Sequence, residues 1–370
     1  MYKRLVLVNF LAFVIASIFQ TTMYAESKNE PTLIYRYHTD RLKQELVAKL
    51  PPFHFAAMSP GTSFIYLERI GATKNDATTS FLYNLKTKKL LPLNGGKGKW
   101  YPKSDKLLLQ EAGNLISFDP VTYQSRMLVA ASKNDPIIDY AVSPDETYMV
   151  FFKKDLSVSK QETLLYLQHL PTGKMKVNDR FSSTDEKNRF SRYFQWFPNS
   201  KKVFYIAGTS IKELDLPTGL KFVHKRTDLP SYSADLQYAY ESNQTGDYLK
   251  KLDNGKTTLV GKYTDSIYQG SLDNVKWSPT GHSFVADEFL YGSNAQDTYS
   301  RLHYQNGEKG RYFPDVSYGE PKLFLHENVR FIGWSKDSKW IYTADLHSIH
   351  CNSYEGRCVP YSNSLLVSEP

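Results

Sequence analysis

The residues best able to do chemistry are few and scattered. The one cluster of histidine and cysteine is His347, His350 and Cys351. Residues three apart in a strand point to opposite faces, which argues against joint metal ligation. The chain has no Gly-x-Ser-x-Gly elbow and no Asp-rich calcium loop, and the glycines and lysines at 95–99 lack the spacing of a phosphate-binding loop. We therefore predict no catalytic residue, no metal and no cofactor.

Charged side chains near expected strand ends and in long connections are the candidate binding residues. Asp287 and Glu288 follow an apolar run and could face the mouth of a central channel, with Tyr291 close behind. A comparable place in an earlier unit holds Lys153 and Lys154. The long connection 178–192 contributes its three arginines, Arg180, Arg189 and Arg192. Loops held by a rigid scaffold often bind partners, although surface variation alone would produce the same pattern.

The two cysteines, Cys351 and Cys358, lie in a stretch that is typical of a β-hairpin turning near Glu355 and Gly356. In such a hairpin the cysteines would be directly opposed, with Cα atoms about 4.5 Å apart in a non-hydrogen-bonded pair. We predict a disulfide that fastens the last hairpin of the fold.

A short turn between two apolar runs organises the whole chain. The clearest copy is Trp-Ser-Pro-Thr-Gly at 277–281. Proline presets φ for a turn, and Asp, Asn or Gly suits the next positions. The other copies begin at Met58, Trp100, Val142, Trp196, Ser233 and Trp334, and the copy at Ser233 is degenerate.

The spacing of the copies predicts the architecture. From the serine at 59 to the serine at 335 there are six steps, with a mean length of about 46 residues. A period near 40–50 residues with strands alone is typical of a β-propeller. We predict an all-β propeller of seven four-stranded blades over 53–362, or six blades if the copy at Ser233 is accidental. Pro-Thr-Gly at 171–173 and 217–219 marks a second turn, between the third and fourth strands.

These turns resemble the repeat of the TolB-type periplasmic propellers, also called the WD40-like or PD40 repeat. The best copies are 277–281 and 142–145, and the resemblance covers roughly 53–362. It implies a propeller fold, a periplasmic setting and a protein partner in an envelope complex. The repeat occurs in proteins of unrelated function, so it carries the fold and little else.

The two ends of the chain are expected to differ from the propeller. Residues 1–25 have a basic start, an apolar run and Ala25 at the expected cleavage position, which predicts a secretory signal peptide. Between 26 and 52 we expect a strand at Thr32–Tyr37, which could help to close the ring, and a short amphipathic helix at 40–50. Residues 363–370 are a tail. We expect no transmembrane segment after the signal is removed.

Removal of the signal would lower the formal net charge from +8 to +6. This modest excess suits a solvated surface, or weak contact with anionic envelope surfaces. No nucleic-acid motif is present. The leading hypothesis is a periplasmic or secreted, non-enzymatic protein-interaction scaffold. The alternative is a propeller enzyme or carbohydrate-binding protein with its site at the central channel.

Overall fold

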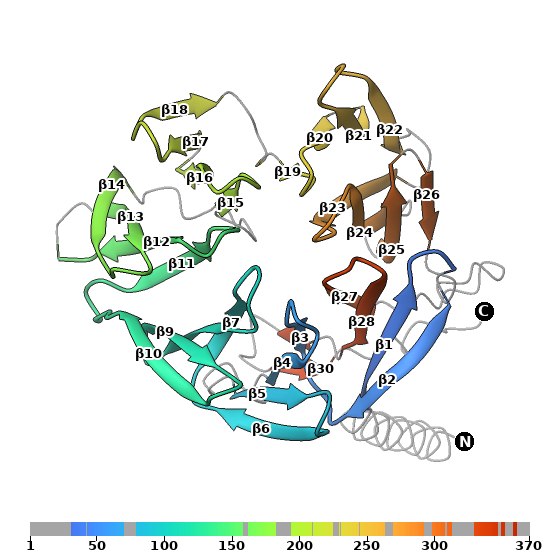
Figure 1. The fold of residues 1–370 in the computed structure, drawn as a ribbon, viewed down its shortest axis with the longest axis horizontal. Helices are drawn as coiled ribbons and strands as arrows, with labels where there is room; N and C mark the ends of the chain where they lie inside the picture. The colour runs from blue at the N-terminus through green and yellow to red at the C-terminus, as the bar shows by residue number, and fades with distance from the viewer. Residues whose placement is uncertain are drawn as a thin grey trace, which may run out of the picture.

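The computed structural model describes residues 31–41, 43–69, 79–157, 162–182, 194–208, 210–224, 229, 231–243, 245–262, 269–291, 298–307, 309–312, 329–346, 349–351 and 358–360. All regular elements among these residues are strands. They form seven four-stranded antiparallel sheets and one two-stranded hairpin. Figure 1 shows the seven sheets arranged as blades around a ring. The predicted seven-bladed β-propeller is confirmed.

Blades one to three follow one another along the chain, each starting with its innermost strand. Their strands are β3 (Phe55–Met58), β4 (Phe64–Arg69), β5 (Thr79–Asn84) and β6 (Lys89–Leu93) in blade one; β7 (Gly96–Trp100), β8 (Leu107–Glu111), β9 (Asn114–Asp119) and β10 (Gln124–Val129) in blade two; β11 (Ile137–Val142), β12 (Tyr148–Asp155), β13 (Glu162–His169) and β14 (Met175–Ser182) in blade three.

Blades four to six repeat this order. Their strands are β15 (Phe194–Trp196), β16 (Lys202–Ala207), β17 (Ser210–Asp215) and β18 (Lys221–His224) in blade four; β19 (Ser231–Tyr232), β20 (Tyr238–Asn243), β21 (Gly246–Lys251) and β22 (Thr257–Lys262) in blade five; β23 (Gln269–Trp277), β24 (Ser283–Tyr291), β25 (Thr298–Asn306) and β26 (Lys309–Tyr312) in blade six. The Pro-Thr-Gly turns connect β13 to β14 and β17 to β18, as predicted.

The seventh blade joins the two ends of the chain. Its inner strands are β27 (Val329–Trp334) and β28 (Trp340–Asp345), and its outer strands are β1 (Thr32–His38) and β2 (Gln44–Leu50). Strand β1 pairs with β28 from Leu33 opposite Asp345 to His38 opposite Trp340. The ring is therefore closed by the N-terminal strands, as expected for β1, and the propeller begins near Thr32 rather than at Phe53.

One prediction about the N-terminal part was wrong, and the C-terminal hairpin lies outside the blades. The helix expected at 40–50 is strand β2, which pairs with β1 and buries Ala48 and Leu50. The edge of β1 offers a whole row of backbone partners, and that gain overrides the local helical pattern. The hairpin of β29 (Ile349–Cys351) and β30 (Cys358–Pro360) is a separate sheet, so it does not supply the last strands of a blade.

The hairpin register does place Cys351 directly opposite Cys358. The disulfide between them stays a prediction. Residues 1–30, which include the predicted signal peptide, and the tail at 363–370 lie outside the described residues. Within the part of the chain that the structure describes, no helix has the length and apolar character to cross a membrane.

The core consists of apolar contacts between neighbouring blades. In most blades the second strand is nearly continuous in buried apolar residues, as in Phe64–Leu67 and Met149–Phe152, whereas only Ala239 is buried among the described side chains of β20 in blade five. Such runs are typical of strands covered on both faces. The outer strands are mostly exposed, for example Gln124–Met127 of β10.

In each blade that carries the serine of the repeated turn, the serine N–H donates to the carbonyl five residues on. In blade three, Ser143 is fully buried, donates to Asp145 Oδ1 at 2.5 Å and accepts the N–H of Tyr148 at 2.9 Å. The degenerate copy makes the same bonds, from Ser233 to Asp235 Oδ1 at 2.7 Å and from Tyr238 N to Ser233 Oγ at 2.9 Å. The copy at Ser233 is therefore genuine, which explains why seven blades form rather than six.

Where a tryptophan precedes the turn, it holds its blade to the one before it. Trp100 Nε1 donates to Ala57 O of blade one at 2.9 Å, and Trp334 Nε1 donates to Lys276 O of blade six at 3.1 Å. Trp277 Nε1 donates instead to the hydroxyl of Ser231 in blade five, at 2.8 Å. The indole thus packs at the seam while its one donor is satisfied, as a buried indole requires.

Candidate functional site

The polar side chains of the repeated turns are used to connect neighbouring blades. Glu146 Oε1 of blade three accepts the backbone N–H groups of Lys103 and Ser104 in blade two, both at 2.7 Å. Asp105 Oδ1 of blade two accepts the N–H of Gly61 in blade one at 2.6 Å. These carboxylates accept hydrogen bonds from backbone N–H groups of the preceding blade. They therefore connect neighbouring blades and are not free acids.

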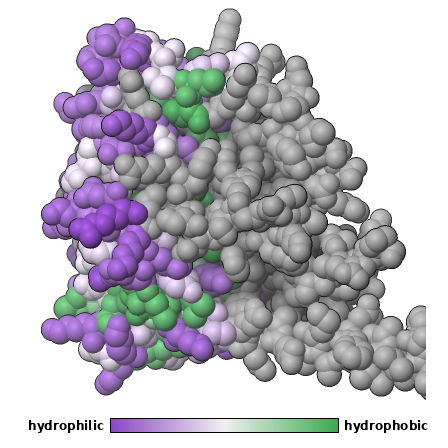
Figure 2. Space-filling view, turned by 90° about the vertical axis from the view of Figure 1, so that its right-hand side faces the viewer, coloured by the Kyte–Doolittle hydropathy of each residue, from purple (hydrophilic) through white to green (hydrophobic). Residues whose placement is uncertain are grey.

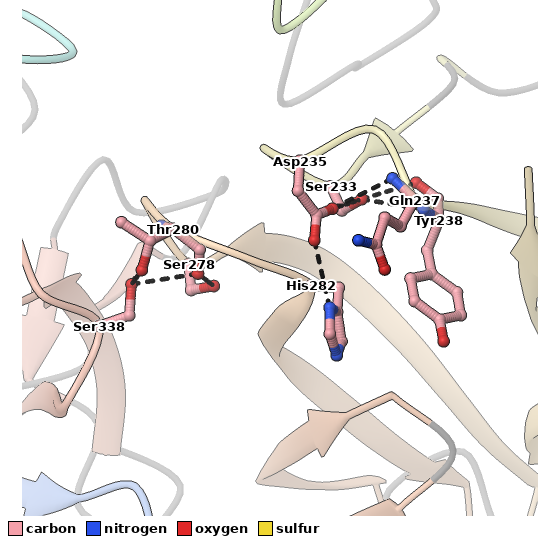
Figure 3. A network of polar contacts seen from close by, with 8 residues as sticks. All are labelled: Ser233, Asp235, Gln237, Tyr238, Ser278, Thr280, His282 and Ser338. Carbon is pink, nitrogen blue, oxygen red and sulfur yellow. Dashed lines mark hydrogen bonds and ion pairs between the residues drawn. The ribbon is translucent and has the colours of Figure 1, made fainter.

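The same arrangement continues through blades five, six and seven. Figure 3 shows His282 Nδ1 of blade six 3.2 Å from Asp235 Oδ2 of blade five. The Thr280 hydroxyl and backbone N–H lie 2.8 and 3.1 Å from Ser338 Oγ of blade seven. Burial alone would raise the pKa of Asp235, but its hydrogen bonds with Ser233, Gln237 and His282 lower that pKa below its ordinary value.

The predicted binding residues of blade three lie in strands, close to one end of the blade. Lys153 is a partly buried structural cation, because its Nζ donates to Ala130 O at 2.8 Å and to Asp135 Oδ2 at 2.6 Å. Lys154 is its neighbour in β12. Arg180 lies in the same cross-strand row as Lys153, through Leu164, and pairs with Glu162 at 2.9 Å. Arg189 and Arg192 lie outside the described residues.

The predicted residues of blade six are not brought to those of blade three. Asp287, Glu288 and Tyr291 lie within β24, which extends to Tyr291 instead of ending before Asp287. Asp287 Oδ2 accepts a hydrogen bond from Asn274 Nδ2 at 3.1 Å. Blades three and six stand on opposite sides of the ring (Figure 1). The sequence candidates therefore do not form one site.

An ionic cluster that the sequence did not indicate lies between blades three and four. Asp179 of β14 is only 8% exposed and accepts hydrogen bonds from Tyr205, Lys212 and Lys221 at 2.7, 2.8 and 3.0 Å. Burial alone would raise the pKa of Asp179, but these bonds outweigh burial and lower that pKa to about 2. The cluster fastens two blades together.

The outer rim of blades one to four has a distinctive composition. We define this rim as strands β6, β10, β14 and β18 together with the turns that precede them. Every exposed charged residue on it is a cation, since its one carboxylate, Asp179, is buried. These cations are Lys86, Lys88, Lys89, Arg126, Lys174, Lys176, Arg180 and Lys221.

Large apolar side chains are exposed between these cations. Val223 on β18 is 67% exposed and Met127 on β10 is 59% exposed. The full set on the rim is Val121, Tyr123, Met127, Met175, Val177, Leu220, Phe222 and Val223. By contrast, the described surface in Figure 2, on the opposite side of the ring, is mostly hydrophilic, with one hydrophobic patch above and one below. Clustered exposed apolar groups on a soluble protein mark interaction surfaces.

A polar cleft of about 390 Å³ opens on this rim between blades two and three. Its two carboxylates are already occupied, since Asp119 Oδ1 accepts the N–H groups of Val121 and Thr122 at 2.9 and 3.2 Å and Glu146 clamps the neighbouring turn. Its cations, Lys106 and Arg126, make no ion pair with the described residues. Both cations can therefore pair with an anionic group that enters the cleft.

Tyr101 forms the inner wall of this cleft. It is 6% exposed, and burial raises the pKa of its hydroxyl above the ordinary value. The hydroxyl therefore stays protonated and able to donate at neutral pH. The Ser117 side chain also lines the cleft and contacts Tyr101. Among the described residues, no group of three histidine, cysteine or acidic side chains is placed to hold a metal ion.

Comparisons with known proteins support the fold. No family model matches the chain, and no curated protein matches it. A structure of an oligogalacturonate lyase in complex with manganese is similar with a TM-score of 0.52 at 12% identity, over 85% of this chain and 96% of that one. The chain therefore shares the β-propeller fold with this structure. A candidate TolB from Agrobacterium tumefaciens aligns at 16% identity, over 85% of this chain and 98% of that one, with a TM-score of 0.44.

The propeller also resembles part of a larger enzyme. The dipeptidyl peptidase 4 of Porphyromonas gingivalis aligns over 91% of this chain but 57% of its own, at 8% identity and a TM-score of 0.50. At these identities the likeness is one of fold alone. The functional argument therefore rests on the surface of this chain.

Sequence reasoning missed Tyr101, Lys106 and Arg126. They belong to the second repeat, and the cleft exists only because the turn at Leu170 and Pro171 of the third repeat closes it. The exposed cation in an outer strand, Arg126 between Ser125 and Met127, was the one available signal. The place of Arg126 at the cleft can be recognised only when the packing of blades two and three is known.

Proposed function

We propose that this chain is an exported, non-enzymatic scaffold whose outer rim on blades one to four binds a protein partner in the cell envelope. The observation that carries the proposal is the composition of that rim, where exposed cations and large apolar side chains occur together and no exposed carboxylate interrupts them. A partner would bury the apolar groups, and the cations would orient it and accelerate association.

The construction of the ring supports a scaffold. Blades are held to one another by buried serines, by indole donors and by carboxylate clamps, such as the bonds from Lys103 and Ser104 to Glu146. A surface on such a rigid ring loses little conformational entropy when it binds. Export follows from the leader at 1–25, and the TolB-type repeat favours the periplasm.

The test is crosslinking in intact cells, followed by purification of the tagged chain and mass spectrometry. A stoichiometric envelope partner is expected. The rim variant Phe222→Ser/Val223→Ser should lose that partner, because both side chains are exposed on β18. The matched variant Leu252→Ser/Leu259→Ser removes exposed apolar groups from blade five and should keep it.

The same purified sample is analysed for bound metal, and its N-terminus is sequenced. An N-terminus at Glu26 in the periplasmic fraction is expected. A chain with one tightly bound metal and no partner would overturn the scaffold proposal. It would favour the rival function, an enzyme or a carbohydrate-binding protein acting at the central channel.

A further inference from the structure

Resting on the scaffold function above, we propose that strand β10 of blade two binds an extended partner segment in which acidic and apolar residues alternate. The segment would add to the open edge of the blade as a fifth strand. Its acidic side chains would enter the polar cleft toward blade three, and its apolar side chains would enter a second groove toward blade one.

Strand β10 has a free edge. Among the described residues it pairs only with β9, from Gln124 opposite Asp119 to Val129 opposite Leu115. Its residues 124–127 are all exposed. An edge strand presents unpaired backbone donors and acceptors, and extended peptides commonly use such edges. Here the edge carries Met127 at 59% exposure, next to a single cation, Arg126.

The two faces of β10 border two different hollows. Toward blade three lies the polar cleft of about 390 Å³, to which Arg126 contributes from β10 and Lys106 from the turn before β8. Toward blade one lies a groove of about 280 Å³ lined mainly by apolar side chains. That groove is formed by Leu82, Leu91, Pro92, Leu93, Leu109, Ile116, Phe118 and Tyr123, with Asn94, Glu111 and Ser125 at its polar margin.

The chemistry of the two hollows specifies the occupant. Side chains of a strand alternate between faces, so a strand added to β10 sends every second side chain into each hollow. The cations of the polar cleft make no ion pair with the described residues, and its carboxylates already accept backbone N–H groups. The cations can therefore pair with an acidic group of a bound segment. The groove between blades one and two selects an apolar group. Alternating acidic and apolar residues match both hollows in one register.

The charge of the neighbouring rim favours the same partner. On both sides of β10 the rim carries cations, including Lys86 and Lys88 of blade one and Lys174 and Lys176 of blade three. An acidic segment would be attracted over the length of the rim, while a basic segment would be repelled. The two hollows add a preference for alternating acidic and apolar residues, which the positive charge of the rim alone would not provide.

Methionine methyl signals offer a direct assay with an internal control. The mature chain would contain Met58, Met127, Met149 and Met175. Met127 lies on β10, Met175 lies exposed on β14, and the other two are buried. The probe is the peptide acetyl-Thr-Val-Glu-Val-Glu-Val-Thr-amide, added to the methyl-labelled mature protein. We expect the Met127 methyl resonance to shift and the Met175 resonance to stay.

Four comparisons test the recognition chemistry. A glutamine version of the peptide should bind at least tenfold more weakly, as should a version of equal composition with its glutamates adjacent. An N-methylated version should not bind, because it cannot pair with a strand edge. The variant Arg126→Gln/Lys106→Gln should weaken binding about tenfold. The variant Lys336→Gln/Lys339→Gln, which removes equal charge from the exposed turn between β27 and β28 of blade seven, should bind within twofold of the natural chain.

Three results would overturn the inference. One is equal binding by the chain with and without Arg126 and Lys106. Another is an equal shift of the Met127 and Met175 signals, which would mean a diffuse attraction to the rim. The third is broadening of Met127 by phosphatidylglycerol vesicles without any response to the peptide, which would assign β10 to an anionic lipid surface. If the Arg126→Gln/Lys106→Gln chain still captures its partner in cells, this inference alone fails and the scaffold function stands.

Discussion

The ionic cluster between blades three and four gives a quantitative test of how the ring is held together. The change is Asp179→Asn, which keeps the shape of the side chain and removes its charge. Asp179 is 8% exposed and accepts hydrogen bonds from Tyr205, Lys212 and Lys221. These bonds outweigh the effect of burial and lower the pKa of Asp179 to about 2. The ordinary value is 3.8. Folding therefore favours the charged form of this carboxyl.

The size and pH dependence follow from that difference. Each unit of pKa is worth about 1.4 kcal/mol, so the ionised Asp179 contributes about 2 kcal/mol to the free energy of unfolding at pH 7. Because the folded pKa is lowered, the contribution is complete above the unfolded pKa and disappears as pH falls through the folded one. At pH 3 about 1 kcal/mol should remain. Salt should reduce both figures, since Lys212 and Lys221 are partly exposed.

The assay is urea unfolding of the natural chain and the Asp179→Asn variant at pH 7 and pH 3, followed by tryptophan fluorescence and circular dichroism. The two signals should coincide before free energies are compared. The control is Asp253→Asn, which removes an exposed carboxylate 3.1 Å from Lys251 and should change stability little. A destabilisation by Asp179→Asn that is the same at both pH values would refute the reasoning, because it could not come from the charge.

Three further changes probe the construction of the ring. Ser233→Ala should cost about 1–2 kcal/mol in urea unfolding, because the N–H of Tyr238 loses its acceptor; an unchanged midpoint would mean that this turn is dispensable. Gly98→Ala should destabilise by more than about 2 kcal/mol, since its Cβ would lie 2.5 Å from the ring of buried Tyr66. A natural midpoint for that variant would show that the ring can move away. A chain starting after Leu50 lacks β1 and β2 and should self-associate through the open edge of β28, as measured by light scattering. A monomeric, folded product would contradict ring closure by these strands.

The repeat was readable from sequence because each turn is a local structure. Serine, proline and aspartate act within five residues, so the bonds around Ser143 can be expected without knowing the fold. Even the degenerate copy at Ser233 kept the serine and the aspartate that make them. Blade number and period followed from counting these turns.

The features that the sequence did not reveal depend on pairing between strands that are far apart in the sequence. The segment 44–50 has apolar residues spaced for a helix, yet it pairs with β1, whose other neighbour is β28 some 300 residues away. Leu46 is 60% exposed as a consequence. The hairpin at 349–360 was recognised as a hairpin, but a hairpin pattern does not specify which sheet it joins. Long-range pairing decided both cases.

The candidate site was missed for the same reason, because its residues come together only when the blades pack. Arg126 and Lys106 are separated from the third-repeat turn at Leu170 by about one repeat, and their cleft arises only when two blades pack. The repeat fixes how blades pack, whereas the side chains of outer strands take little part in that packing. Those outer positions are therefore free to vary without loss of the fold. Clustered cations and apolar groups on successive outer strands are then unexpected for a purely structural rim, and this is why we assign recognition to the rim rather than to the clamped turns.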